Sequence, residues 1–208
     1  MELEIRDLAA EELPAAGGVA GRALADSPTF RWVLGDHAIP RVRQSLDVFV
    51  PFVSAMPPPQ LGAFLGSHVV GVAAAAAPGG CIGAVATEEL RTPPTVIGPP
   101  GDDSRTLLVW SLFCGHDLDE RHWHVGPVSV EPGLQGLGIG GALLSALCAR
   151  MDDAGEVAWL ETDKPDNVVF YRRHGFDVVE EVVAPDAAAY AGRPEPPFTT
   201  WFMRRDPR

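Results

Sequence analysis

Lysine is nearly absent from this chain of 208 residues: Lys164 is the only one, and 16 basic residues stand against 28 acidic ones. The formal net charge is −12. Nucleic acids and anionic membranes bind clustered cations, so this composition argues against both as partners. Solubility accounts for most of the excess of acidic residues. We expect small molecules as ligands.

Cysteine is also scarce. Cys81, Cys114 and Cys148 form an odd, scattered set without C-x-x-C spacing, which indicates neither a disulfide framework nor a zinc site. No apolar run reaches transmembrane length, and the N-terminus lacks a charged-then-apolar signal pattern. We therefore expect a cytoplasmic protein with one globular domain over residues 1–208, since 46% hydrophobic content supports a sizeable core.

Glycine, in contrast, is concentrated in one place. Residues 128–130 form a short apolar strand, and Gly136, Gly138, Gly140 and Gly141 follow it and open a helix rich in Leu and Ala. Glycines have no Cβ, so a ligand can approach the backbone closely. The free N–H groups of a helix's first turn carry partial positive charge. The order of strand, turn and helix predicts a site for phosphate or pyrophosphate.

One candidate ligand for this turn is a dinucleotide. Gly136, Gly138 and Gly141 spell G-x-G-x-x-G, and Glu161 lies about 20 residues further on, as the fingerprint of such sites requires. That turn should follow its strand at once, however, whereas five residues separate Val130 from Gly136. Too little chain remains after Glu161 for the other strands. An NAD(P)-dependent oxidoreductase is therefore a distant alternative.

The same stretch resembles motif A of the GNAT (Gcn5-related) N-acetyltransferases, V-x-P-x-x-[QR]-x-x-G-x-[GA]. The matching residues are Val130, Pro132, Gln135, Gly138 and Gly140. A second segment resembles the family's N-x-x-F-Y-x-x-x-G-F ending, with Asn167, Phe170, Tyr171, Gly175 and Phe176. An L-E-T strand end at 160–162 and T-W-x-M at 200–203 are most similar to the puromycin N-acetyltransferase type. The resemblance covers residues 122–205.

This resemblance implies an α/β (α+β) fold, with a mixed, mostly antiparallel sheet of six or seven strands. The sheet would be splayed at strands 4 and 5 and covered by helices on both faces. The implied activity is direct transfer of acetyl from acetyl-CoA to a primary amine of a small molecule, by a monomer or homodimer without a metal. The alternative is a sensor that binds acyl-CoA without turnover, which the intact Tyr171 argues against.

The resemblance also implies roles for particular residues. The acetyl-CoA site would comprise Val128, Ser129, Val130, Gln135, Gly136, Leu137, Gly138, Ile139, Gly140, Gly141, Asn167, Phe170 and Tyr171. The N–H of Val128 would donate to the thioester carbonyl and stabilise the oxyanion. The hydroxyl of Tyr171 would protonate the departing thiolate, since a phenol and an alkyl thiol have roughly matched acidities.

His122 and His124 lie two apart on a strand, so both side chains point to one face. Three interpretations apply. A solvated face is the commonest, and a metal site would need a third ligand, so we expect no metal. The third is a general base, His124 or His122, that takes a proton from the acceptor amine. Both histidines would then line the acceptor site together with aromatic walls from Phe30 and Trp32.

Hydrophobic periodicity and turn residues predict the elements along the chain. We expect a first strand near residues 3–8, helices at 11–25 and 40–56 with an aromatic turn at 30–34 between them, and a hairpin over 60–77. A loop over 79–103 would hold at most one short helix, around 85–91. The elements expected after this loop are a helix at 104–114, a strand at 122–130 with a bulge at Gly126-Pro127, a helix from 137, a strand at 157–160, a helix at 165–174, and strands at 176–183 and 198–204.

Overall fold

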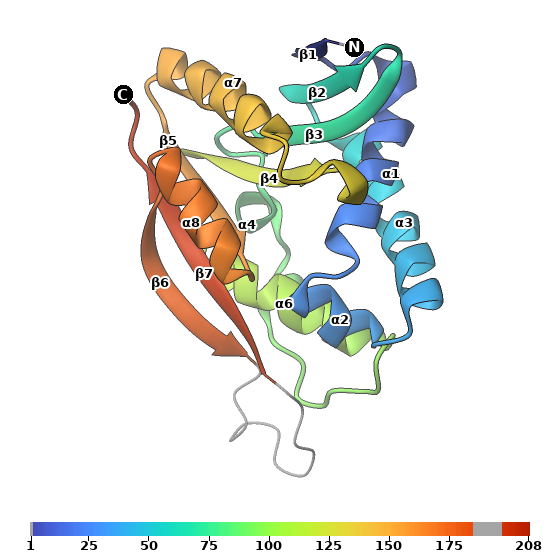
Figure 1. Cartoon of the computed structure of the whole chain (residues 1–208). Helices are drawn as coiled ribbons and strands as arrows, with labels where there is room; N and C mark the ends of the chain where they lie inside the picture. Colours follow the sequence, from blue (N-terminus) through green and yellow to red (C-terminus); the bar gives the residue numbers. More distant parts are fainter. Residues whose placement is uncertain (1, 185–196) are drawn as a thin grey trace.

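The computed structural model describes residues 2–184 and 197–208, which build one seven-stranded sheet (Figure 1). The strand order is β1-β2-β3-β4-β5-β7-β6. All neighbours are antiparallel except β4 and β5, which run parallel. The strands are β1 (Leu3–Asp7), β2 (Gln60–Leu65), β3 (His68–Ala76), β4 (His122–Val130), β5 (Val157–Thr162), β6 (Asp177–Ala184) and β7 (Phe198–Arg205). The predicted mixed, mostly antiparallel sheet is confirmed.

Helices connect the strands. The α-helices are α1 (Leu13–Leu24), α2 (Pro28–Leu34), α3 (Ala38–Ala55), α4 (Ile82–Val85), α5 (Glu88–Arg91), α6 (Asp103–Gly115), α7 (Ile139–Ala154) and α8 (Pro165–Arg173). Two short 3-10 helices, η1 (Ala10–Glu12) and η2 (Pro132–Leu134), precede α1 and α7. Within the described ranges no helix is long and apolar enough to cross a membrane.

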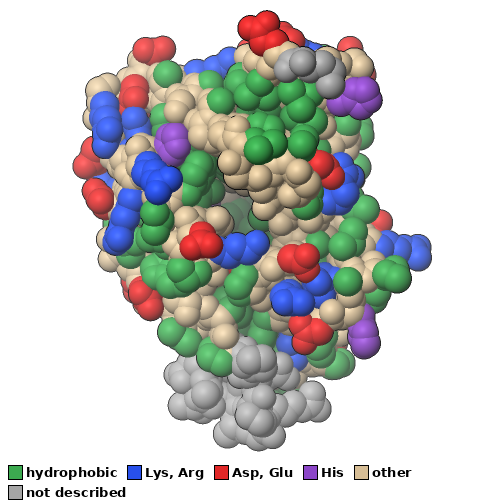
Figure 2. All heavy atoms as spheres, in the orientation of Figure 1, with side chains coloured by type: hydrophobic (Ala, Val, Ile, Leu, Met, Phe, Trp, Pro, Cys, Tyr) green, Lys and Arg blue, Asp and Glu red, His purple; other side chains and the backbone are tan. Residues whose placement is uncertain are grey.

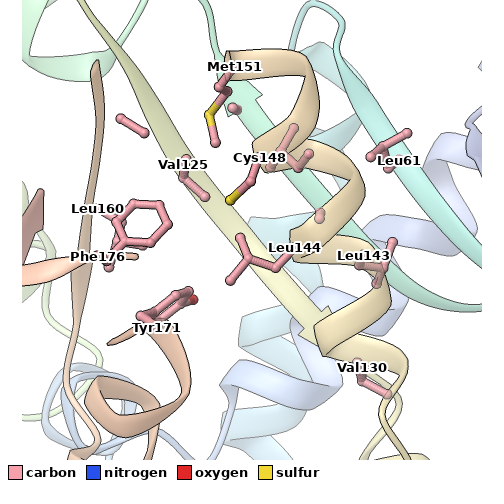
Figure 3. Packing of buried hydrophobic residues seen from close by; sticks show 14 of the residues in the cluster. Leu61, Val125, Val130, Leu143, Leu144, Cys148, Met151, Leu160, Tyr171 and Phe176 are labelled. Carbon is pink, nitrogen blue, oxygen red and sulfur yellow. The ribbon is translucent and has the colours of Figure 1, made fainter. Parts of the chain in front are cut away.

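One face of the sheet is covered by α7 and α8. The buried stripe of α7 packs on the middle strands: Leu144 and Cys148 point toward Val125 of β4, while Leu143 lies on the side of β2 and β3 (Figure 3). These apolar side chains recur at helical spacing and exclude water from the centre of the sheet. The helix α7 is thereby fixed over β4, and its N-terminus lies beside the end of that strand.

The other face carries two smaller cores. Ala16 and Ala20 of α1 pack with Phe49 and Val53 of α3 and with Val72 of β3. Close packing of α1 against α3 depends on Gly17, because a Cβ there would lie 2.6 Å from the Cα of Val50. A further core joins α2 and α6 to β6 and β7, through the buried side chains Trp32, Val33, Leu108, Val109, Ala184 and Phe198.

Strand β4 parts from β5 after the first third of its length. The two strands pair in register from His122 with Val157 to His124 with Trp159, and the pairing ends there. On its other edge β4 pairs with β3, where the register shifts between Ala73 and Ala75. The shift leaves Gly126 and Pro127 as the extra residues, so the bulge expected at Gly126-Pro127 is present.

Two local predictions were wrong. Residues 30–34 do not form an aromatic turn but belong to α2, which begins at Pro28. Ser27 caps this helix, accepting a hydrogen bond from the N–H of Phe30 at 3.2 Å, and Pro28 occupies the first helical position, where its missing N–H costs nothing. The loop over 79–103 holds two short helices, α4 and α5, instead of one.

Candidate active site

The glycine turn between β4 and α7 has the backbone of an anion site. Gly136 and Gly138 have φ angles of 79° and 84°, in the left-handed region that other residues avoid, and both are exposed. The helical hydrogen bonds begin with the N–H of Ala142, which donates to the carbonyl of Gly138 at 3.0 Å. The N–H groups of Ile139, Gly140 and Gly141 therefore precede the ladder and lie at the positive end of the helix.

Side chains hold this turn in place from both sides. Gln135 Nε2 donates to the carbonyl of Val130 at 3.1 Å, which ties the turn to the end of β4. Glu131 pairs with Arg22 of α1 through contacts of 2.8 and 2.9 Å. The turn is therefore prepared before a ligand binds, while Leu137 projects from it with 69% of its surface exposed.

Beyond His124, strand β4 has β3 on one edge, and the β4–β5 pairing does not continue along the other. Val128 and Val130 still pair with Ala73 and Gly71 of β3. Ser129 is 4% exposed and its hydroxyl finds no hydrogen-bond partner in the described structure. An extended ligand arm that enters between the splayed strands can pair with such a strand as an added neighbour does.

Tyr171 projects from α8 into the core on the same face as α7 (Figure 3). Its ring packs against Phe170 and Phe176, with centroids 5.2 and 5.8 Å away. Burial, followed by the charges of Glu161 and Asp163, raises the pKa of the phenol above its usual value. Tyr171 therefore keeps its proton at neutral pH, as the proposed proton donor must.

The neighbouring helix residue Asn167 donates from Nδ2 to Thr162 Oγ1 at 3.0 Å, which joins the start of α8 to the end of β5. The loop between them is tied to α2, because the N–H of Thr29 donates to Asp163 Oδ2 at 2.8 Å. Figure 2 shows the surface hollowed near its centre, at the place where Figure 1 has the space between α8 and α2 below β4. The splayed strands open into this hollow.

His122 and His124 share the face of the sheet opposite α7, as the strand alternation predicted. Both contact the buried carboxylate of Asp117, His122 Nε2 at 2.9 Å and His124 Nδ1 at 3.3 Å from Oδ1. Burial disfavours the charged form of His122, but the contacts with Asp117 and Cys81 outweigh burial and raise its pKa to about 10. Burial opposes charging of His124 as well, and Glu161, 2.8 Å from Nε2, leads the contacts that raise its pKa well above the usual value.

These shifts bear on the role predicted for the two histidines. An imidazole that already carries both protons accepts no further one from an amine, so a metal-free cluster would hold both rings in the wrong state for a base. The base role of His124 or His122 stays a prediction.

The aromatic walls predicted for the acceptor site lie in different surroundings. Phe30 is half-buried, with its ring 5.2 Å from that of Phe49. Trp32 is 5% exposed and packs between Phe198 and the guanidinium of Arg105. Phe30 is thus the more accessible of the two, and both roles stay predictions.

Sequence reasoning missed Cys81, Asp117 and Asp163. Cys81 and Asp117 flank α4 to α6 and meet the histidines only through the tertiary fold, so no spacing pattern marks them. Asp163 follows the L-E-T strand end directly, and its place between β5 and α8 was the available signal. Glu161 was considered as part of the dinucleotide fingerprint and of the L-E-T strand end, with no role of its own, yet here it faces His124.

The geometry of the turn and splayed strands agrees with a comparison against protein families. Residues 27–176 match the model described as the acetyltransferase (GNAT) family. The chain belongs to the GNAT acetyltransferase family. It is therefore an acetyl-CoA-dependent N-acetyltransferase, and the oxidoreductase and sensor alternatives are set aside.

Solved structures with the GNAT fold resemble the chain along nearly its whole length. The polyamine N-acetyltransferase of Drosophila melanogaster has a TM-score of 0.66 at 16% identity, over 99% of this chain and 100% of its own. The Corynebacterium glutamicum protein described as histone acetyltransferase HPA2 and related acetyltransferase has a TM-score of 0.64 at 19% identity, over 100% and 98%. The PaiA N-acetyltransferase of Thermoplasma acidophilum, solved with coenzyme A, has a TM-score of 0.52 at 15% identity, over 99% of each chain. At these identities the likeness concerns the fold.

Proposed function

We propose that this enzyme moves the acetyl group of acetyl-CoA directly to the primary amine of a small cationic molecule. The turn from Gln135 to Gly141 receives the pyrophosphate, because its free N–H groups and glycine backbone suit an anion. The pantetheine arm lies between the splayed strands along Val128 to Val130. The acceptor enters from the hollow beside α2 and α8 (Figure 2).

The chemistry follows from this placement. The acceptor ammonium first gives one proton to water, and its neutral nitrogen then attacks the thioester carbonyl carbon. The oxyanion that develops accepts a hydrogen bond from the N–H of Val128. The carbon–sulfur bond breaks as Tyr171 donates its proton to the departing thiolate, and the phenolate takes up the proton that the nitrogen loses when the amide forms. Asn167 holds the start of α8 against β5 through Thr162, which keeps the phenol aimed at the sulfur.

The observation that carries the choice of a cationic acceptor is the position of two carboxylates at the end of β5, where Asp163 accepts a hydrogen bond from the N–H of Thr29 in α2 and Glu161 lies 2.8 Å from His124. After burial, the charges of Glu161 and Asp163 are what raise the pKa of the phenol, so both act on the position where the acid works. A cationic amine is stabilised by the same charges. The net charge of −12 favours the approach of a cation, and the similar Drosophila enzyme is described as a polyamine N-acetyltransferase that forms N-acetylagmatine.

The direct test is a thiol-release assay with acetyl-CoA against a panel of amines. The panel holds polyamines, agmatine and aminoglycosides as cations, neutral arylalkylamines, and acidic amino acids. Aminonucleosides are included because the L-E-T and T-W-x-M segments resemble those of the puromycin N-acetyltransferase type. We expect the highest kcat/KM among the cations. Turnover of neutral or acidic acceptors alone would overturn the proposal.

A single substitution sharpens this test. Asp163→Asn removes a charge but keeps an oxygen that can accept the hydrogen bond from Thr29. We expect it to raise KM for the cationic acceptor more than for a neutral one. Asp36→Asn is the matched control, because this carboxylate is 90% exposed on the far end of α2 and changes the net charge equally. Equal effects of the two variants would show that only bulk charge matters.

A further inference from the structure

A compact group of potential metal ligands lies against β4, on the face opposite α7. Its members are Cys81, Asp117, His122 and His124, and we call it the Cys-Asp-His-His cluster. One donor atom from each, a sulfur, a carboxylate oxygen and two ring nitrogens, lies within 4.8 Å of all the others. The histidines come from β4, Cys81 caps the start of α4, and Asp117 follows α6. The fold therefore brings three separate segments to one point.

The outer hydrogen bonds of the two histidines determine which ring nitrogens carry protons. His122 Nδ1 lies 2.8 Å from the carbonyl of Glu120, which can only accept, so this nitrogen is the donor. His124 Nε2 lies 2.8 Å from the carboxylate of Glu161 and is a donor for the same reason. When the rings are neutral, His122 Nε2 and His124 Nδ1 therefore carry no proton, and their lone pairs point into the cluster.

These inner atoms are buried and lack satisfied hydrogen bonds. Asp117 Oδ1, His122 Nε2 and His124 Nδ1 are fully enclosed, and none has a hydrogen bond of acceptable geometry in the described structure. Cys81 Sγ lies 3.0 Å from the other oxygen of Asp117. These converging atoms require positive charge among them, which ring protons supply in the metal-free cluster and which a metal ion can supply in their place.

We propose that Cys81, Asp117, His122 and His124 bind one zinc ion. Thiolate, imidazole and carboxylate are the ligands that zinc prefers, and four of them make a closed tetrahedral site of the structural kind. Tetrahedral zinc separates its donor atoms by roughly 3.3–3.8 Å. The widest pairs of the cluster, which lie within 4.8 Å, would move closer together, and the contacts of Asp117 with His122 and Cys81, at 2.9 and 3.0 Å, would lengthen slightly. The contacts of the histidines with Glu120 and Glu161 are the outer hydrogen bonds that zinc-bound histidines almost always make.

This inference replaces the expectation of no metal, which rested on the scattered cysteines, on the lack of a third ligand beside His122 and His124, and on the resemblance to a family without a metal. The zinc would attach the segment from α4 to α6 to the middle of the sheet. It would also occupy His124 Nδ1, so the ligand role and the predicted base role of His124 exclude each other. The proposed acetyl transfer does not depend on the zinc, because its acid, oxyanion donor and nucleotide site lie elsewhere.

The test compares two buried cysteines in the full chain. Cys81→Ala removes a ligand, whereas Cys148→Ala is the matched control, since Cys148 lies in the core beneath α7. Each protein is purified with zinc, dialysed, and analysed for metal by mass spectrometry. We expect about one zinc per chain in the wild type and in Cys148→Ala, and loss of the ion from Cys81→Ala.

Thermal unfolding of the chelator-treated proteins gives a second readout. Zinc at about 100 times its Kd should raise the Tm of the wild type and of Cys148→Ala by roughly 5–10 °C, with no rise for Cys81→Ala. Absence of zinc from the wild type together with an unchanged Tm would overturn the proposal. So would equal binding by Cys81→Ala, which would place the ion elsewhere.

A third measurement covers the case in which Cys81→Ala does not fold. X-ray absorption of the wild-type zinc protein should show one sulfur at about 2.3 Å and three nitrogen or oxygen ligands at about 2.0–2.2 Å. A shell without sulfur would contradict the proposal. None of these readouts involves acetyl transfer, so failure of the zinc site and failure of the proposed function are told apart.

Discussion

His124 and Trp159 form the last pair in register between β4 and β5. Upstream of them the sheet is continuous, and downstream the strands diverge around the bulge at Gly126 and Pro127. The gap between β4 and β5 begins part-way along the two strands, within the sheet itself. A ligand arm that enters this gap can therefore reach the middle of the sheet without a deep pocket. The splayed edge lies between the glycine turn and Tyr171, and the first two predictions test these two sides.

Tyr171→Phe removes one hydroxyl and keeps the ring that packs against Phe170 and Phe176. We expect kcat to fall by about 10²–10⁴, the usual contribution of a positioned acid, while the affinity for acetyl-CoA changes little. Steady-state kinetics and calorimetry on the same preparation measure both quantities. A lower affinity with unchanged kcat would assign Tyr171 to binding.

Gly138→Asp places a side chain and a negative charge where φ is +84° and the pyrophosphate should lie. We expect acetyl-CoA affinity to fall on the order of 100-fold, which calorimetry measures directly. Gly133→Asp introduces the same charge in the same connection, where an added Cβ meets nothing within 4 Å and φ is not positive. Equal losses of acetyl-CoA affinity in both variants would mean that the added negative charge repels acetyl-CoA from either position, and that Gly138 has no special place in the site.

The buried guanidinium of Arg205 joins β7 to α7, because it donates to both oxygens of Asp152 at 2.7 and 2.6 Å. We expect Asp152→Asn to lower the free energy of unfolding by about 1.5–3 kcal/mol at pH 7, measured by urea denaturation. Asp153→Asn, at an exposed neighbouring position, is the control and should change little.

The same pair predicts a pH dependence. Hydrogen bonds from Arg205 lower the pKa of Asp152 in the folded state. The stabilisation is therefore fully present above the unfolded carboxyl pKa of about 3.9 and is lost as the pH falls through the lower folded value. The gap in stability between wild type and Asp152→Asn should close as the pH is lowered from 6 toward 2. A gap that stays constant would mean that charge on Asp152 is not its source.

The side chain of Leu144 is fully buried in the core between α7 and the sheet (Figure 3). We expect Leu144→Ala to cost about 3 kcal/mol of unfolding free energy, since the cavity can collapse only in part. Val179→Ala, at a side chain that is 57% exposed on β6, should stay within about 0.5 kcal/mol. Similar losses at both positions would show that α7 is not seated as described.

The sequence predicted features that depend on neighbours in the chain. The turn at Gly136 and Gly138 was recognisable because strand, loop and helix follow one another, and the bulge because Gly126 and Pro127 suit no regular strand. Helix α2 was missed although Ser27 and Pro28 are a good helix start, since the same residues also break a preceding helix. The meeting of Cys81 and Asp117 with the histidines could not be predicted, because it depends on how α4 and α6 pack.

The contact between Cys81 and Asp117 joins residues 36 positions apart at 3.0 Å. It joins the two ends of the segment that holds α4, α5 and α6. Changes of length or composition in the α4–α5 part of this segment need not disturb β4 or the glycine turn. The contact between Cys81 and Asp117 would keep the ends of the segment in place while the residues between them rearrange. Transplanting that stretch between related enzymes with both of its closing residues should therefore leave the acetyl-CoA half unchanged.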